Sequence, residues 1–237
     1  MIILNIETAL TTCSVALSKD NNCIFYKENS QGMNHAALLS VFIQEAIDFL
    51  KTTQEKISAV AVSSGPGSYT GLRIGVSTAK GLCYALDIPL IAVNTLEIIA
   101  KKVIDNSNYT ENILFCPMID ARRMEVYTAL FSRQLDYIEP ISSTIIDENS
   151  FSEILETRKI VFFGNGAAKC KDIISNENAV FIDGIDACAE KMIYFSQKAF
   201  EQKKFEDVAY FEPFYLKEFQ ATIPKNKVIA PQNADKQ

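Results

Sequence analysis

The chain has 237 residues, a formal net charge of -6 at pH 7 and a pI near 5.0. Hydrophobic residues make up 48% of it and charged residues 22%, which is enough to bury a core and excludes a wholly disordered chain. An acidic surface repels the phosphate backbone of nucleic acids. We therefore expect this chain to have no broad basic face for RNA, and we expect a partner to hold any RNA that it serves.

In the first half of the sequence, three apolar segments precede an alternation of helices and strands. Strands are expected at 2–6, 12–17, 23–26, 57–62 and 90–93, and helices at 35–50, 69–86 and 95–103. Asn34 is placed to cap the first of these helices.

The second half repeats this order in outline. Strands are expected at 113–119, 125–131, 137–138 and 159–163, and helices at 151–155, after 164–166 and at 187–201. Turn-forming residues at 105–108 separate the halves. The pattern predicts an α/β protein of two related lobes with mixed sheets, residues 1–105 and 106–222, followed by a polar tail at 223–237.

The six cysteines and the N-terminal residues indicate the cellular compartment of the protein. No C-x-x-C pair occurs, which favours reduced core thiols in a cytosolic protein. The first residues lack the basic region of a signal peptide, and no apolar run approaches the ~18 residues of a membrane span. We therefore expect a cytoplasmic protein without a membrane segment.

A glycine-rich loop at 63–75 lies between an expected strand and an expected helix. Free amides at a helix start can bind an anion, and the candidate contacts are Gly65, Gly67, Ser68, Thr70 and Arg73. However, Thr70 stands where both the P-loop and the dinucleotide fingerprint require glycine. The spacing is more typical of a tight, packed turn than of a nucleotide site.

The helix after this loop carries a face of mostly small residues, formed by Gly71, Gly75, Thr78, Ala79 and Leu82. Small residues allow another helix to approach closely. The partner could be the chain's own first helix, with Leu38, Leu39 and Phe42, or a helix of another subunit. The sequence favours neither.

Three polar features have both a functional and a structural interpretation. His35 is the only histidine, which excludes a two-histidine metal site and favours a surface or interface position. Glu7 could hold a metal, but a lone acid at a strand end more often caps a turn. Arg122 and Arg123 could bind phosphate or a partner carboxylate, or could simply form a solvated turn.

Together these segments resemble the TsaB (YeaZ) family over residues 2–217. The most specific piece is the run at 65–75 with its continuation at 78–82. Supporting segments lie at 6–8, 13–17, 120–123, 125–127, 164–166 and 213–216. The resemblance implies an actin-like ATPase (ribonuclease H-like) fold, within the TsaD-related, glycoprotease-like members of the actin/Hsp70/sugar-kinase superfamily.

The resemblance also implies a function. TsaB-like proteins are non-catalytic subunits in the synthesis of threonylcarbamoyladenosine (t6A) at adenosine 37 of tRNA. They support and activate a TsaD-like catalytic subunit, which a TsaE-like ATPase joins. ATP and a metal ion are expected in the assembled complex through these partners, and whether this chain itself binds nucleotide stays open. tRNA is contacted only indirectly, and a homodimer is expected when the partner is absent.

The family's pairing surface is formed by the first two helices of the first lobe. Carried over to this sequence, it comprises His35, Leu38, Leu39, Phe42, Gly71, Ile74, Gly75, Thr78, Ala79 and Leu82.

Two positions depart from the family pattern. Ala36 and Ala37 stand where relatives often have Ser-Glu, so we assign these positions no polar role. Glu7 stands where many relatives have Asp, which weakens a metal or nucleotide role in this chain. The rival functions are a sugar kinase or phosphotransferase of the same fold, a glycoprotease-like peptidase and a purely structural dimer.

Overall fold

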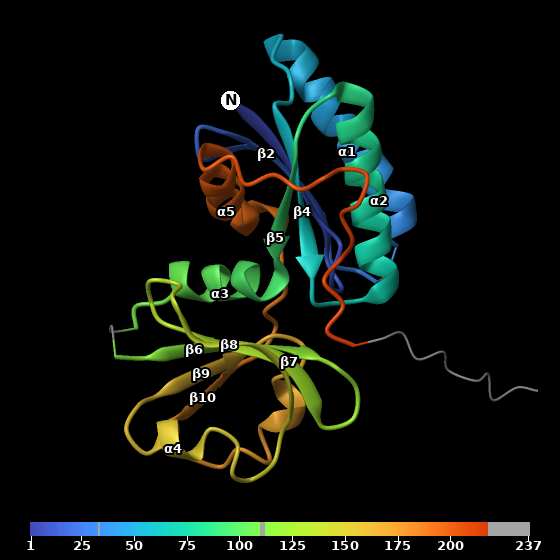
Figure 1. The fold of residues 1–237 in the computed structure, drawn as a ribbon. Helices are drawn as coiled ribbons and strands as arrows, with labels where there is room; N and C mark the ends of the chain where they lie inside the picture. Colours follow the sequence, from blue (N-terminus) through green and yellow to red (C-terminus); the bar gives the residue numbers. More distant parts are fainter. Residues whose placement is uncertain (33, 110–111, 218–237) are drawn as a thin grey trace, which may run out of the picture.

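The structure is a computed structural model of the chain that describes residues 1–32, 34–109 and 112–217. Two five-stranded mixed sheets lie one above the other, with helices on their faces (Figure 1). The tail expected at 223–237 lies outside the described residues.

The first sheet has the strand order β3-β2-β1-β4-β5. The first three strands form an antiparallel meander, while β4 and β5 run parallel to β1. The strands are β1 (Ile2–Glu7), β2 (Cys13–Lys19), β3 (Asn22–Asn29), β4 (Ala59–Gly65) and β5 (Leu90–Asn94).

The second sheet repeats this plan. Its order, β8-β7-β6-β9-β10, again places the first strand in the centre, an antiparallel meander on one side and two parallel strands on the other. This repetition confirms the predicted pair of related α/β lobes. The strands are β6 (Leu114–Asp120), β7 (Glu125–Phe131), β8 (Tyr137–Ile145), β9 (Ile160–Phe163) and β10 (Ala179–Ile182).

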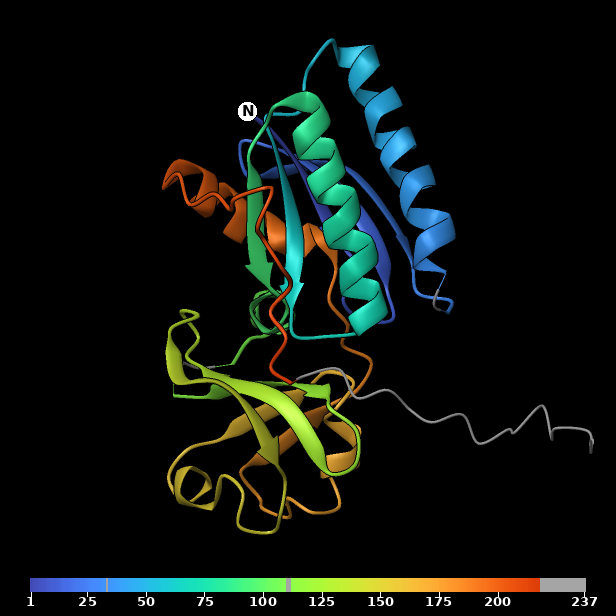
Figure 2. The same cartoon turned by 45° about the vertical axis from the view of Figure 1, so that its right-hand side comes forward.

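Helices cover both faces of the first sheet. The helices α1 (His35–Thr53) and α2 (Tyr69–Leu86) lie side by side on one face, and α5 (Ala189–Glu201) lies on the other (Figure 2). The strand period of two explains this arrangement, because Leu4 and Ile6 pack in the core under α1 and α2, whereas Ile3 faces away from it.

The helix α3 (Thr95–Asp105) joins the two lobes. It begins where Asn94 Oδ1 accepts the Leu96 amide at 2.9 Å, and it lies between the sheets in contact with both. Its apolar residues share one core with side chains from the first sheet, such as Ile91, and from the second, such as Phe115 and Phe163. The lobes are therefore held by a continuous hydrophobic core.

The C-terminal segment corrects the expected lobe assignment. Residues 187–222 were expected in the second lobe, yet α5 packs on β1, β2 and β5 of the first sheet. Residues 202–217, here called the strap, then run along the first lobe. The Glu206 amide donates to Leu90 O at 2.9 Å and the Phe214 amide donates to Ser64 O at 2.7 Å. Sequence periodicity identifies such a helix but not the sheet on which it packs.

Several local predictions also differ from the structure. The four-residue β10 was not predicted, β8 is longer than the expected 137–138, and the helix expected after 164–166 is only the short 3-10 turn η1 (Ala168–Cys170). The short helix expected at 151–155 is, by contrast, confirmed by α4 (Ser152–Leu155). Asn34 precedes α1, but its backbone is not extended and its side chain makes no capping bond.

The glycines of α2 permit its close approach to the end of β1. A Cβ atom on Gly71 would lie 2.1 Å from Thr8 O, and one on Gly75 would lie 2.3 Å from Thr8 Oγ1. Thr8 Oγ1 also donates a hydrogen bond to Gly71 O at 2.8 Å. The small-residue face of α2 therefore packs against its own chain.

We expect Gly75→Ala to destabilise the protein by about 1–3 kcal/mol, because the added methyl group overpacks this contact. Gly81→Ala is the matched control, since a Cβ on this exposed glycine of the same helix meets no atom within 4 Å. The control should be neutral or stabilising by up to about 1 kcal/mol. Urea unfolding measures both; equal effects would contradict the packing argument.

Candidate functional site

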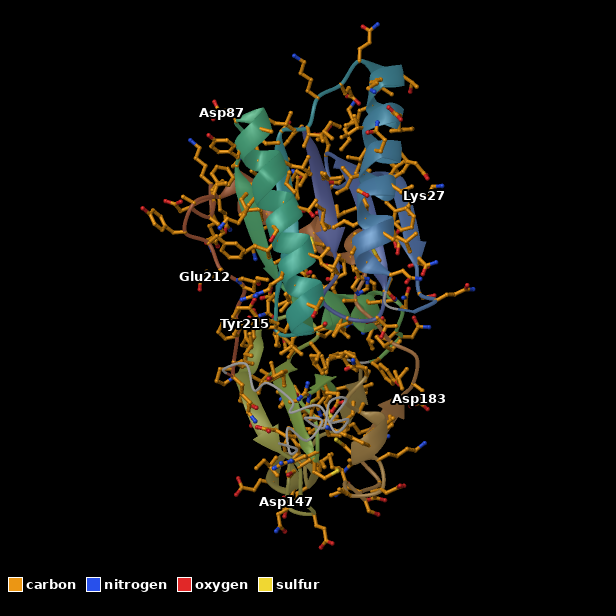
Figure 3. All side chains as sticks on the ribbon, turned by 90° about the vertical axis from the view of Figure 1, so that its right-hand side faces the viewer. Lys27, Asp87, Asp147, Asp183, Glu212 and Tyr215 are labelled. Carbon is orange, nitrogen blue, oxygen red and sulfur yellow. The ribbon has the colours of Figure 1, made fainter. Side chains whose placement is uncertain are left out.

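The outer surface of α1 and α2 carries the first candidate site (Figure 3). Leu38, Phe42, Ile74 and Leu82 are partly buried against the first-lobe core, and Thr78 is also half-buried. Three other apolar side chains on these helices are more exposed, Val41 at 48%, Tyr84 at 86% and Leu86 at 49%. The helices thus present apolar side chains to solvent.

Five of the ten residues expected in this surface are buried within the chain, where they pack beneath the outer surface of the helices. They are His35, Leu39, Gly71, Gly75 and Ala79.

His35 is buried, and not exposed as its position in the sequence indicated. Its Nε2 lies 2.8 Å from Leu10 O, which fixes the proton on Nε2 because a carbonyl only accepts. This bond ties the start of α1 to the loop after β1. Its Nδ1 is buried and has no hydrogen-bond partner among the described residues.

The glycine-rich loop does not present a free phosphate cradle. A Cβ on Gly65 would lie 2.8 Å from Phe214 O in the strap, and one on Gly67 would lie 2.5 Å from Ala9 O. The Ser68 amide donates to Ala9 O, and the Ser68 hydroxyl caps α2 by accepting the Gly71 amide at 3.2 Å. The chain's own backbone therefore lies directly against both glycines, as expected for a tight, packed turn. Thr70 and Arg73 remain exposed.

Glu7 occupies a buried position at the end of β1. Its Oε1 accepts the Ala9 amide at 2.6 Å, while its Oε2 has no partner in the described part of the chain. Burial raises the pKa of Glu7 to about 8, the negative charge of Asp186 adds to the rise, and the Ala9 amide opposes it. Glu7 is therefore largely protonated at neutral pH.

The turn between β6 and β7 places two arginines near the joint of the lobes. Arg122 and Arg123 have φ values of 69° and 49°, an uncommon backbone region for such residues. Asp120 stabilises the turn by accepting the Arg122 amide at 3.0 Å, and Lys169 Nζ donates to Asp120 and to the carbonyls of Arg123 and Glu125. The side chains of Asp120 and Lys169 therefore stabilise the turn that carries the two arginines.

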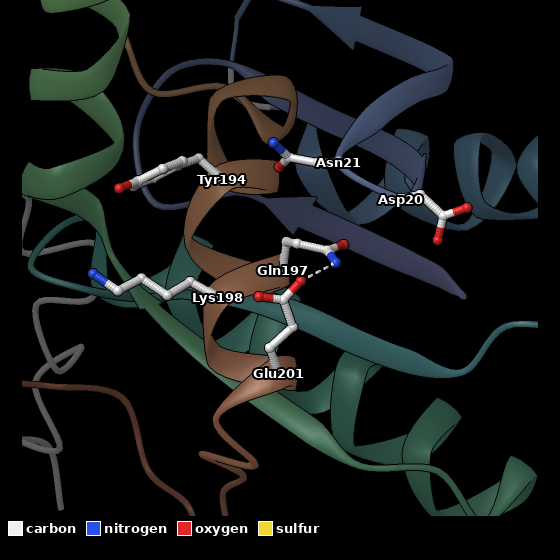
Figure 4. A pocket seen from close by; sticks show the side chains of 6 residues that line it. All are labelled: Asp20, Asn21, Tyr194, Gln197, Lys198 and Glu201. Carbon is white, nitrogen blue, oxygen red and sulfur yellow. Dashed lines mark hydrogen bonds between the residues drawn. The ribbon is translucent and has the colours of Figure 1, made fainter.

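A hollow of about 460 Å³ lies beside α5 and the β2–β3 turn (Figure 4). Its lining is polar and open, and Gln197 Nε2 donates to Glu201 Oε1 at 2.7 Å across the helix surface. It lies on the opposite face of the first sheet from α1 and α2 and brings together none of the predicted site residues.

Two other classes of site do not occur in the described ranges. Residues 1–32, 34–109 and 112–217 hold no group of three or more histidine, cysteine, aspartate or glutamate side chains placed to bind one metal ion. Within the same ranges, no helix has the length and apolar character to cross a bilayer.

Known proteins with similar sequence define the class. Residues 29–233 match the family model TsaD, described as tRNA N6-adenosine threonylcarbamoyltransferase. The TsaB protein of Bacillus subtilis is 31% identical over 74% of this chain and 76% of its own length. The TsaB protein of Escherichia coli K12 is 30% identical over 92% and 95%. Both are named tRNA threonylcarbamoyladenosine biosynthesis proteins.

Solved structures agree on the fold. A Pseudomonas aeruginosa protein described as similar to peptidase YEAZ has a TM-score of 0.76 at 22% identity, covering 91% of this chain and 99% of that one. YeaZ from the same organism has a TM-score of 0.73 at 21% identity over the same shares. The family model and the sequence matches place the chain among the TsaD-related proteins. Within that class it belongs to the TsaB (YeaZ) family, which confirms the resemblance.

Glu7 gives a pH-dependent prediction. Its pKa is about 8 in the folded chain against an ordinary value of 4.5, so between these values the folded state holds a proton that the unfolded state has lost. Stability contributed by neutral Glu7 is complete below about pH 4.5 and falls as pH rises, by about 1.4 kcal/mol per pH unit up to pH 8.

We therefore expect Glu7→Gln, which mimics the neutral acid, to gain stability relative to wild type from pH 5 to 8. Urea unfolding of both proteins at each pH measures this difference, in which the titration of all other groups cancels. A difference that does not change with pH would show that Glu7 ionises normally.

Proposed function

We propose that this chain is a non-catalytic subunit required for threonylcarbamoyl transfer to adenosine 37 of tRNA, acting in the cytoplasm. The observation that carries the proposal is membership of the TsaB family over nearly the whole length of the E. coli relative. In this proposal the chain supports and activates a TsaD-like catalytic subunit, and a TsaE-like ATPase joins the pair.

Three features support an accessory rather than a catalytic role. The chain has one histidine and cannot supply the histidine pair of a TsaD-like metal site. Its similarity to a named transferase, that of Carboxydothermus hydrogenoformans, covers 40% of this chain and 33% of the enzyme. Glu7, the acid at the end of β1, is buried and largely neutral. We therefore assign ATP and the metal ion to the partners.

The outer surface of α1 and α2 is the proposed pairing surface. Exposed apolar side chains such as Val41 and Leu86 are removed from water when a partner helix covers them, which stabilises the complex. The same surface would pair two copies of this chain when the catalytic subunit is absent, giving a homodimer.

The structure weighs against the kinase alternative. A sugar kinase of this fold needs room for nucleotide phosphates, but the chain's own backbone lies against Gly65 and Gly67. The peptidase alternative appears in the name of a P. aeruginosa neighbour and concerns that protein. ATP turnover or peptide cleavage by the purified chain at an enzyme-like rate would contradict an accessory role.

The pairing surface can be tested with charge placed on its exposed positions. We expect Gly81→Arg and Val41→Glu to leave folding intact, because Gly81 has free space around it and Val41 is half exposed, and to weaken pairing at least tenfold through the cost of burying a charge. Gel filtration with light scattering of this chain and the same cell's TsaD-like subunit measures the complex.

Ile145→Glu is the control, since Ile145 lies on β8 of the second lobe and is 71% exposed. It should leave pairing unchanged, and circular dichroism should show all three variants folded. If the wild-type chain forms no complex at micromolar concentrations, the accessory function is wrong. If it does and all variants pair normally, the surface lies elsewhere.

A further inference from the structure

The strap brings cations and aromatic rings together where the two lobes meet. Arg73 Cζ lies 4.2 Å from the centre of the Tyr69 ring, and the Tyr69 and Tyr215 ring centres are 5.2 Å apart. Tyr69 and Arg73 belong to α2, whereas Tyr215 belongs to the strap, which Figure 3 shows at the level between the lobes. Tyr215 is exposed, so one side of this stack is open to solvent.

The strap continues directly to the arginine turn. Two residues after Tyr215, Lys217 Nζ pairs with Glu125 at the start of β7. Tyr127 on the same strand lies within electrostatic reach of both Lys217 and Arg122: burial raises the pKa of Tyr127, and these two cations oppose the rise. The stack and the turn are thus parts of one surface. We call it the joint strip: Tyr69, Arg73, Arg122, Arg123, Tyr215 and Lys217.

The charges of the turn are unbalanced in favour of the cations. Asp120 is paired with Lys169, and Glu125 is paired with Lys217 and accepts the Ser143 hydroxyl at 2.6 Å. The nearby carboxylates are therefore already occupied. Among the described residues, the guanidinium groups of Arg122 and Arg123 form no ion pair, and both residues are exposed. The local field favours an anionic ligand although the whole chain is acidic.

The mixture of groups indicates the class of ligand. A partner carboxylate would use the arginines but has no need of open aromatic rings. A single-stranded nucleic acid uses both, because its phosphates pair with arginine and its unstacked bases stack on tyrosine. Duplex RNA presents no free base faces and would use only the cations.

We propose that the joint strip binds a single-stranded segment of RNA, with Arg122 and Arg123 contacting phosphates and Tyr215 stacking on a base. This site departs from the expectation that tRNA is contacted only indirectly. It is local and adds to the grip of a partner, because the net acidic charge of the chain disfavours any broad contact with RNA. It depends on the proposed function only for its natural ligand, which would be an unpaired segment of tRNA.

The test uses the full chain without its partner, so that its outcome does not depend on pairing. Fluorescence anisotropy with a labelled single-stranded RNA, and with its duplex, is measured between about 50 and 200 mM KCl. We expect binding to the single strand at micromolar concentrations in low salt and weaker binding to the duplex.

The charge variant combines Arg122→Asn with Arg123→Asn, because asparagine tolerates the left-handed backbone of this turn. It should weaken RNA binding by about tenfold, and the slope of log affinity against log salt should fall by about 1.4, or roughly 0.7 for each phosphate that is no longer neutralised. The control combines Lys56→Asn with Lys203→Asn, which removes the same charge from exposed residues outside the strip; Lys203 also has a left-handed φ of 55°. The control should bind RNA like wild type.

Three further variants test the contribution of the Tyr215 ring and the sign of the local electrostatic field. Tyr215→Ala should weaken binding about fivefold or more, while Tyr215→Phe, which keeps the ring, should not. Glu212→Gln removes an exposed carboxylate from the strap near Tyr215 and should strengthen binding (Figure 3).

Either of two results would overturn the proposal: no binding of single-stranded RNA in low salt, or equal weakening by the arginine and lysine pairs. Loss of pairing with the TsaD-like subunit in the arginine variant, with RNA binding unchanged, would instead make the strip a protein contact. Failure of the wild-type chain to pair, with RNA binding intact, would contradict only the proposed function.

Discussion

The contact between α2 and the end of β1 is the constraint on which the first lobe depends. Gly71 and Gly75 bring the helix so close that Thr8 occupies the space of their missing side chains and donates to Gly71 O. In the glycine-rich loop that precedes this helix, Gly65 and Gly67 lie against the backbone of Phe214 and Ala9. Gly81, further along α2, is exposed and has free space around it.

The two lobes are joined twice, by different kinds of contact. α3 contributes apolar side chains to a core that contains residues of both sheets, which is strong because it removes a large apolar area from water. The strap adds directional contacts, from Phe214 to Ser64 on the first lobe and from Lys217 to Glu125 on the second. Exposed ion pairs contribute little stability, so the second join positions the strap more than it stabilises the fold.

The polar groups at the end of the first sheet illustrate how burial changes chemical character. Glu7 stands where an acid could serve a cofactor, but desolvation raises its pKa and leaves Oε2 without a partner in the described structure. The Ser63 hydroxyl is likewise buried, and its interaction with Glu7 opposes the rise of that pKa. The residue types alone would indicate a polar site, whereas their burial indicates a closed interior.

The sequence by itself determined the order of most strands and helices, the repeated plan of the two lobes and the family, because periodicity and the motif at 65–75 are local properties of the chain. It did not determine which sheet α5 covers, since an amphipathic helix fits either. It also left open whether Gly71 and Gly75 face a partner or the interior, and it wrongly indicated a surface or interface position for His35, because helical spacing gives a face but not its neighbour. Only the tertiary structure decided these points, since burial and the contact of Lys217 with Glu125 depend on segments far apart in the chain.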